Sequence, residues 1–451
     1  MRIAQSKPLF AWDCLEDSPT LKTIRELLAA VPDGQLLESL RSARGKGRND
    51  YPVHVLWGVV LLTILLRHRD TEACLAELKR NAGLARLIGI ESETDVPSKW
   101  NMSRFEEALG SEPHRTHLKD IFVQMIARLG AAVPDLGQHT AGDATGLSAR
   151  RSKSVKAQAE QDEGLPQAAG GRKEYLDEQG KVTHVVEWFG FKLHLLVDVQ
   201  HEVALAYEIT DTKAGDGETL PALVDQAQAV LPKGRLETLA YDKAADSNDV
   251  HRRLDRCGIK PLIEMRSLWE REPERRLPGH DGNSNIVYDE AGTLYCYDLM
   301  SRPIVRHPMA YIGHEPQRQT LKYRCPAQHE GWECPMSAIC NAGKSYGLTV
   351  RVKRDIDLRR FPPIPRATKK FERLYKGRTA VERVNGRLKV FWGADDGNLT
   401  GSRRFHAKVG AVLIVHAAFA TLLAAAPRKG TLGKMSLHPV AQALRQKIPA
   451  A

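Results

Sequence analysis

Apolar residues are spaced in two different ways along the chain, and the change between them divides it into parts. Up to about residue 130 they recur at helical spacing. The predicted helices cover Ser18–Leu28, Tyr51–Arg67, Thr71–Arg80, Leu84–Ile90 and Ser103–Leu109. We therefore expect residues 1–130 to form a helical N-terminal domain.

Near residue 137 the pattern changes to strands. The predicted strands cover Gly137–Leu147, Val182–Val199, Glu202–Thr210, Arg235–Asp242 and Lys260–Met265, with predicted helices over Glu218–Leu231 and Ser247–Cys257. This order of elements favours an α/β fold, a mixed sheet with helices on its faces. Arg150–Tyr175 is rich in Ala, Gly, Gln and Lys and has no periodicity, so we expect a mobile basic loop inside a hairpin.

A region rich in Pro, Arg and Tyr follows the fifth predicted strand and breaks this pattern. Short predicted strands, Asn285–Tyr288 and Thr293–Tyr297, indicate an insertion that is largely β. The sheet-forming core is therefore predicted in two pieces, and a polar tail ends the chain. The predicted parts are residues 1–130, 131–265, 266–365, 366–426 and 427–451.

Two apolar runs are long enough to raise the question of a membrane. Val53–Leu66 is too short to span a bilayer and contains a histidine. Val409–Ala426 is borderline in length, rich in alanine and interrupted by His416. We interpret both as buried helices of a large domain and expect no membrane partner.

The stretch 375–389 carries a row of functional groups. Drawn as a helix at about 100° per residue, it places four polar side chains within a sector about 60° wide. These are Tyr375, Arg378, Glu382 and Lys389. One carboxylate thus lies in line with an aromatic hydroxyl and two cations, beside an apolar stripe that would fix the helix on a core.

The same helix has a third, basic sector. It carries Lys376, Arg383 and Arg387, which suits solvent or a phosphate backbone. From geometry alone, an ordinary basic amphipathic helix with a paired Glu explains the stretch equally well.

The net charge indicates a class of binding partner. The 451 residues carry a formal charge of +11 and the pI is about 9.2, which favours a polyanionic partner. The seven cysteines do not suggest a secreted disulfide framework, and the first residues lack the apolar run of a signal peptide. We expect a cytoplasmic protein.

The spacing Tyr-x2-Arg-x3-Glu-x6-Lys in this stretch resembles the signature of bacterial insertion-sequence transposases of the DDE class. Those enzymes have an RNase H-like catalytic core, a helical N-terminal domain that binds the element's ends, and a largely β insertion before the last catalytic helix. Tyr241-Asp242 resembles their second acidic motif, and Phe189–Leu195 resembles their second strand. The expected fold and the resemblance agree.

The resemblance implies that Asp143, Asp242 and Glu382 are the catalytic acids. We expect two of them on neighbouring central strands and the third on a helix packed against the sheet. Carboxylate oxygens suit Mg²⁺ or Mn²⁺, and two ions about 4 Å apart can activate an attacking oxygen and stabilise a leaving one. Other acids compete for these roles, namely Asp135, Asp198, Asp246 and Glu372.

The resemblance also implies contacts to DNA. Arg378 and Lys389 would hold phosphates of the element's end, and Tyr375 would contact a phosphate or stack on a base. Arg383 and Arg387 are further candidates on the basic sector. The expected partners are terminal inverted repeats and target DNA, and pairing of two ends implies at least a homodimer in that complex.

Late cysteines offer a second metal site. Cys325, Cys334 and Cys340, with His329 or Cys296, provide ligands for zinc, but their spacing is not the double CxxC pattern. Reduced structural cysteines are the favoured interpretation.

Two rival functions remain open from the sequence. One is a metal-dependent nuclease on the same fold, which cuts DNA without joining it. The other is a non-catalytic DNA-binding protein, either a repressor or a decayed copy.

Overall fold

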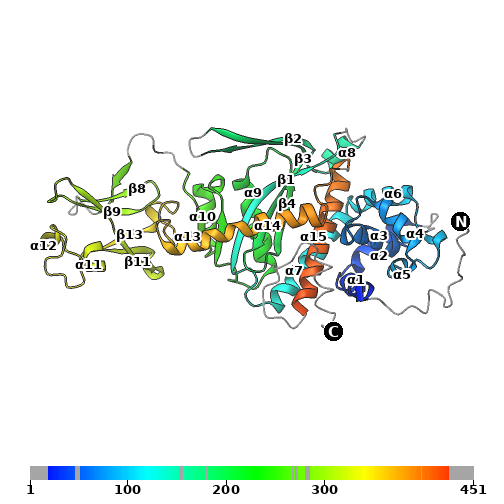
Figure 1. Ribbon diagram of the computed structural model, residues 1–451, viewed down its shortest axis with the longest axis horizontal. Helices are drawn as coiled ribbons and strands as arrows, with labels where there is room; N and C mark the ends of the chain where they lie inside the picture. Colours follow the sequence, from blue (N-terminus) through cyan, green and yellow to red (C-terminus); the bar gives the residue numbers. More distant parts are fainter. Residues whose placement is uncertain are drawn as a thin grey trace, which may run out of the picture.

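A computed structural model describes residues 19–45, 51–151, 156–177, 181–266, 269, 273–279, 285–397 and 399–425. Figure 1 shows three parts along the longest axis of the molecule: a helical region, a central sheet with its helices, and the insertion. The predicted fold class is confirmed. The predicted tail, residues 427–451, lies outside the described residues.

The first part is helical, as expected. Its elements are α1 (Pro19–Ala29), α2 (Gly34–Arg44), α3 (Val53–Leu65), α4 (Thr71–Arg80), α5 (Ala82–Arg86), the 3₁₀ turn η2 (Glu93–Asp95), α6 (Lys99–Leu109) and α7 (His114–Ala132). Side-chain caps fix two of the starts: Asp70 accepts from the Ala73 N–H at 2.9 Å, and Ser98 accepts from the Asn101 N–H at 3.3 Å. The helices α2 and α7 were not among those predicted from the sequence.

A long helix near the end of the chain joins this part to the sheet. α15 (Ser402–Ala425) packs against α1, α3, α6 and α7 on one side and β4 of the sheet on another. It is the one described helix long and apolar enough to cross a bilayer, with a mean hydropathy of 1.9, but 78% of its most apolar window is buried inside the protein. It is the core helix of both parts, so their apolar residues form one continuous cluster.

The central sheet has six strands. Five of them follow the order β2-β3-β1-β5-β6, and β4 pairs with the second half of β3 on the edge opposite β1. The strands are β1 (His139–Ser148), β2 (Ala169–Leu176), β3 (Val182–Asp198), β4 (Ala204–Thr210), β5 (Thr238–Tyr241) and β6 (Lys260–Ile263). β1 is antiparallel to β3 and parallel to β5, and β5 is parallel to β6. Helices α9 (Asp216–Val230) and α10 (Asn248–Arg256) and the turn η3 (Lys243–Ala245) complete this RNase H-like arrangement.

The prediction of a loop over Arg150–Tyr175 is wrong for most of that segment. Residues Ala157–Asp162 form the short helix α8, and β2 pairs along β3 as a two-stranded ribbon. The glycine and alanine residues of β2 do not give the apolar pattern of a strand. The strand pairs with the first half of β3 and does not pack on a buried apolar layer, so such a pattern is not required.

The insertion contains two small sheets with their own core. One holds β7 (Glu274–Arg276), β8 (Ile286–Asp289), β9 (Leu294–Asp298) and β10 (Val305–Pro308). The other holds β11 (Ala310–Glu315), β12 (Thr320–Arg324) and β13 (Thr349–Lys353), with η4 (Pro316–Arg318), α11 (Pro326–Glu330), α12 (Ser337–Cys340) and η5 (Arg354–Ile356) beside them. Its predicted β character is correct.

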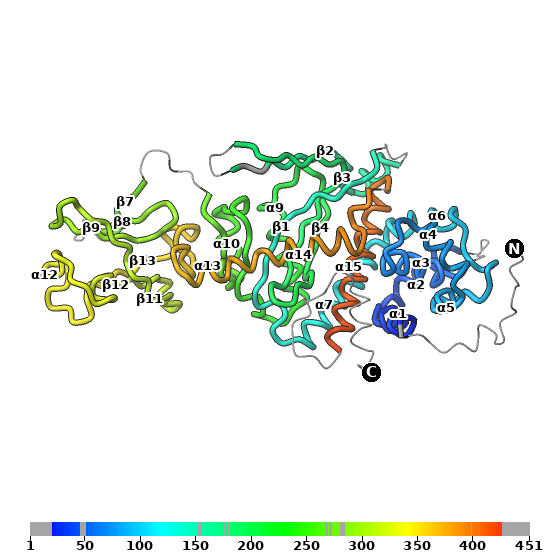
Figure 2. The backbone as a smooth tube through the Cα atoms, in the orientation of Figure 1, coloured from blue at the N-terminus to red at the C-terminus, as the bar shows by residue number. Residues whose placement is uncertain are grey.

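The chain then returns across the sheet. The signature stretch forms α13 (Lys369–Tyr375), the 3₁₀ turn η6 (Lys376–Arg378), α14 (Thr379–Gly386) and the π-helical turn η7 (Arg387–Phe391). Figures 1 and 2 show this run extending from the insertion, over β1, toward α15.

A buried carboxylate fastens the insertion to the core. Asp246 accepts hydrogen bonds from Arg359 (2.7 Å) and from the Arg266 N–H (2.8 Å), and its other oxygen lies 3.1 Å from His251. Burial alone would raise the pKa of Asp246, but these donors and the charge of Arg366 lower it to about 2. Arg266 and Arg359 lie at the two ends of the insertion, so one side chain holds both.

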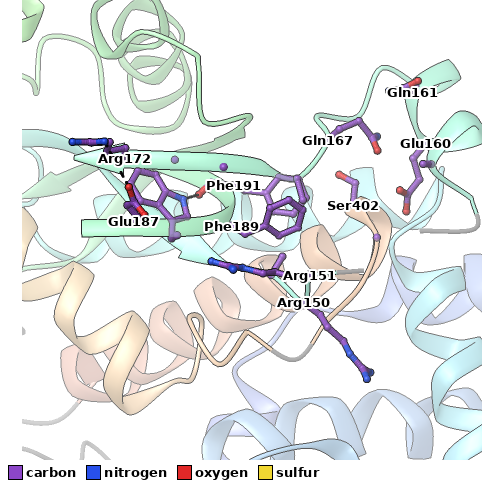
Figure 3. Close-up of a pocket in the computed structure, with 17 residues that line it drawn as sticks. Arg150, Arg151, Glu160, Gln161, Gln167, Arg172, Glu187, Phe189, Phe191 and Ser402 are labelled. Atoms are coloured by element: carbon purple, nitrogen blue, oxygen red, sulfur yellow. Dashed lines mark hydrogen bonds and ion pairs between the residues drawn. The ribbon is translucent and has the colours of Figure 1, made fainter. Parts of the chain in front are cut away.

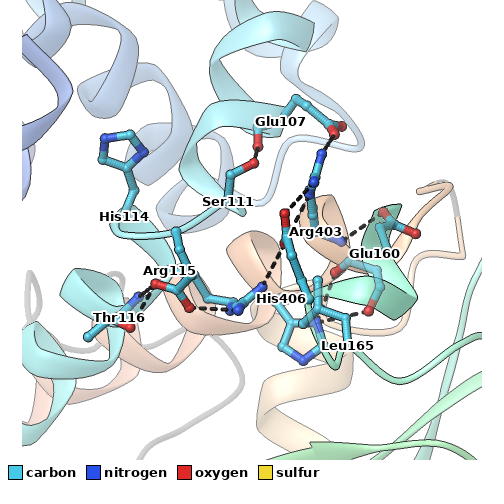
Figure 4. A network of polar contacts seen from close by, with 12 residues as sticks. Glu107, Ser111, His114, Arg115, Thr116, Glu160, Leu165, Arg403 and His406 are labelled. Atoms are coloured by element: carbon cyan, nitrogen blue, oxygen red, sulfur yellow. Dashed lines mark hydrogen bonds and ion pairs between the residues drawn. The ribbon is translucent and has the colours of Figure 1, made fainter. Parts of the chain in front are cut away.

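Polar contacts also join the helical part to the start of α15 (Figure 4). The Arg403 guanidinium donates to Glu107 on α6 at 3.2 Å and to Glu163, which follows α8. The Arg403 N–H donates to the buried Glu160 at 3.1 Å. His406, one turn further, lies next to this network with its Nδ1 2.8 Å from the Ser402 carbonyl.

Stability is expected to fall in mild acid because of buried histidines. Burial lowers the pKa of His406 and of His194 to about 4, from 6.5. Between pH 6.5 and 4 the unfolded chain therefore binds more protons than the folded one, and each histidine removes up to about 3 kcal/mol of unfolding free energy. Melting curves across this range should show less acid sensitivity in His406→Gln than in wild type, while the exposed His184→Gln should behave as wild type. Equal acid sensitivity in all three would contradict the assignment.

Candidate active site

The sheet places the first two predicted acids on neighbouring strands. Parallel pairing sets Ala141 of β1 beside Ala240 of β5, so Asp143 and Asp242, each two residues further, are next to each other. Asp143 lies in the middle of β1, and Asp242 directly follows β5, where its Oδ1 accepts from the Ala244 N–H at 2.8 Å.

The third acid comes from the helix above the sheet. α14 packs against β1 and β3 and carries Glu382, whose side chain is half-exposed. Arg378, one turn earlier, donates to Glu382 at 2.9 Å. Asp143 and Asp242 both raise the pKa of Arg378 through their charges, although burial alone would lower it. All three acids are therefore close enough to the Arg378 guanidinium for their charges to act on it.

Asp143 has a shifted pKa. Burial raises its pKa to about 6, and the negative charge of Asp242 adds to this effect. Lys173 on the β2 ribbon and Arg378 act in the opposite direction. The ribbon, which the sequence analysis took for a loop, thus brings a cation close to the first acid.

A fourth acid at this edge of the sheet was missed. β5 and β6 pair Tyr241 with Ile263, so Glu264 follows β6 as Asp242 follows β5. Glu264 is hydrogen-bonded to the Tyr375 hydroxyl, and burial together with the charge of Glu264 raises the pKa of Tyr375 to about 12. The position of Glu264 directly after a buried strand is the feature of the sequence that could have indicated it.

Lys389 contacts the C-terminal part of β1, beyond Asp143. Its Nζ donates to the Gly146 carbonyl at 2.5 Å and lies 3.4 Å from Asp395. Asp395 in turn accepts from the Ser148 N–H at 2.5 Å. Lys389 is therefore attached to the strand that carries Asp143.

The basic sector of the signature helix faces solvent only in part, since Lys376 and Arg383 are exposed and Arg387 is buried. Arg383 donates to Glu202 at 2.6 Å, and Arg387 is bonded to the same carboxylate. Only 9% of the Arg387 side chain is exposed, against 50% for Arg383. A phosphate contact by Arg387 stays a prediction, and the burial of this side chain on the turn between β3 and β4 argues against it.

Two of the competing acids have structural roles. Asp246 anchors the insertion, as described above. Asp198 is buried and accepts from the N–H groups of Gly137 (2.7 Å) and His201. Both acids are bonded to protein donors, which argues against a role for either of them among the acids near Arg378.

Metal ligands of the right kind are present, but they do not yet form a compact cluster. In the described part of the chain no three Asp, Glu, His or Cys side chains stand close enough to hold an ion as they are. The Arg378 guanidinium is paired with Glu382 and is near enough to Asp143 and Asp242 for their charges to raise its pKa. The oxygen donors fit a hard divalent cation, which would take the place of that positive charge.

A cavity of about 980 Å³ opens beside the C-terminal end of β1 (Figure 3). Arg150, Arg151 and Arg172 line it together with aromatic side chains. Trp188 stands against Gly146 and Gly171, and a Cβ on either glycine would come within 2.4 Å of the indole ring. Glycine is needed at both positions for this close approach.

The late cysteines lie away from these acids, in the insertion. Cys296, Cys325, Cys334 and Cys340 line one small cavity, whereas His329 is exposed on α11 and does not line it. The structure thus favours Cys296 over His329 as the fourth member of the set.

Comparison with known families gives two matches. A family described as "Transposase DDE domain" matches residues 135–417, which is more than half of the chain. A second, described as "Transposase domain (DUF772)", matches residues 13–108. No curated protein matches the chain.

Proposed function

The chain belongs to the DDE transposases, and we propose that it cuts DNA at the ends of an insertion sequence and joins the freed 3′-hydroxyls to target DNA. Membership of this family implies a DNA-acting enzyme that uses divalent metal. The observation that carries the finer proposal is the convergence of Asp143, Asp242 and Glu382 on Arg378.

In the proposed mechanism Asp143, Asp242 and Glu382 would hold two Mg²⁺ or Mn²⁺ ions, and such ions would supply activation of the attacking oxygen and stabilisation of the leaving one. Water attacks in the cleavage step, and a DNA 3′-hydroxyl attacks in the joining step. Arg378 leaves its ion pair with Glu382 and turns its planar fork to a DNA phosphate. Lys389 and Lys173 add point charges on either side of Asp143.

DNA would approach over β1, between the ribbon and the signature helix. The arginines and Trp188 of the adjoining cavity supply phosphate contacts and a stacking surface, the two kinds of contact that a nucleic-acid strand uses. Tyr375 and the half-exposed Arg383 lie along the same helix. The partners proposed are terminal inverted repeats and target DNA in the bacterial nucleoid, with two copies of the chain in the joined complex.

The test uses labelled duplex DNA that carries the inverted repeats flanking the gene, a target plasmid, and Mg²⁺ or Mn²⁺. We expect cuts at the repeat boundary followed by covalent joining to the plasmid, resolved on denaturing gels. Cutting at all sequences without joined products would instead assign a nuclease. Specific binding without cutting in either metal would assign a regulatory or decayed protein.

A further inference from the structure

The insertion gathers four cysteines that lie far from the acids. Cys296 is on β9, Cys325 follows β12, Cys334 lies between α11 and α12, and Cys340 ends α12. All four line one cavity of about 20 Å³ at the junction of the two small sheets. Each sulfur is close enough to every other for their charges to interact, and no disulfide joins cysteines in the described part of the chain.

Hydrogen-bond donors face several of these sulfurs. Asn341 Nδ2 lies 3.7 Å from the Cys325 sulfur, the Met336 N–H donates to Cys334, and the Asn285 side chain donates to Cys340. Burial raises the pKa of the Cys296, Cys334 and Cys340 thiols, and the N–H groups at Cys334 and Cys340 act against that effect. A thiolate is the form of cysteine that binds metal.

The small core around this cavity gives a reason for an ion here. The insertion's two sheets have only four and three strands, and their shared core is separate from the main one. Cores of this size are usually reinforced by disulfides or by a structural metal. Cys296 belongs to the first sheet, and the other three cysteines follow strands of the second.

We propose that Cys296, Cys325, Cys334 and Cys340 bind one zinc ion that clamps the two sheets of the insertion together. Four thiolates are a common ligand set for structural zinc, and its tetrahedral geometry suits donors from four separate chain positions. In the described residues these sulfurs do not stand at metal-binding separations, so binding of the ion would require them to move toward one another. The site is distinct from the carboxylates, whose oxygens suit Mg²⁺ or Mn²⁺.

Metal analysis of protein purified without chelator tests the proposal. We expect about one zinc per chain, retained in Asp143→Asn, and a loss of most of it in Cys296→Ser and Cys334→Ser. Cys257→Ser is the matched control, since Cys257 is free and lies on the core outside this cluster. Less than about half an equivalent of zinc in wild type, or wild-type zinc in both serine variants, would overturn the proposal.

A second measurement does not depend on the folding of variants. Wild-type protein stripped by chelator under reducing conditions should take up one Co²⁺ and develop the sulfur-to-cobalt charge-transfer absorption of a tetrahedral thiolate site. Cobalt uptake without that absorption would place the ion on other ligands and contradict the assignment.

Discussion

Replacing Asp143 with asparagine is expected to slow cleavage at the element's end by at least about 10³-fold. The change keeps the shape of the side chain and removes one carboxylate oxygen from the proposed metal site. Several kcal/mol of transition-state stabilisation depend on such a site, and each 1.36 kcal/mol is a factor of ten in rate. Single-turnover cleavage of labelled element ends measures the effect.

The same variant should remain folded. Asp143 is largely buried next to Asp242, and this burial and the like charge raise its pKa. A neutral amide therefore relieves an unfavourable interaction, so the melting temperature should stay equal or rise. Asp249→Asn is the matched control, because Asp249 is 92% exposed and lies only seven residues after Asp242. Cleavage by Asp143→Asn within tenfold of wild type would remove Asp143 from the catalytic set.

The second large effect is on stability. Asp246→Asn is expected to lower the unfolding free energy by about 3–5 kcal/mol, because it leaves Arg359 and Arg366 buried without their counter-charge. Both arginine side chains are less than one-tenth exposed and Asp246 is fully buried. Urea unfolding followed by tryptophan fluorescence measures the loss.

An exposed ion pair provides the comparison for this variant. Asp225 pairs with Arg253 on the surface, where both side chains are at least 40% exposed. Asp225→Asn should cost less than about 1 kcal/mol, as exposed pairs generally do. If Asp246→Asn cost no more than that, the carboxylate would not be the fastening point of the insertion.

Much of this fold was predictable from the chain. The apolar periodicity gives most helices and strands of the core, and the spacing from Tyr375 to Lys389 identifies the family, which the family comparison confirms. Catalytic roles for Asp143, Asp242 and Glu382 remain predictions. The electrostatic interaction of all three acids with Arg378 agrees with these roles.

What the sequence hid depends on contacts between distant segments. A helical projection shows Arg387 on an outer sector, but it does not show that Glu202 lies 185 positions earlier on the turn beneath it. The strand β2 has too few apolar residues to be recognised without its partner β3. Similarly, the spacing of the cysteines is unlike a zinc motif because the set is completed by Cys296 from another sheet.

The position of α15 has a consequence for how this protein is made. The apolar faces of α1, α3 and α6 rest on a helix that the ribosome produces about 290 to 380 residues later, at residues 402–425. The core of the newly synthesised N-terminal helices is therefore incomplete until most of the chain has been made. A truncated product that ends before residue 402 lacks α15, the helix on which the N-terminal helices pack. Such a product therefore does not contain an intact N-terminal region.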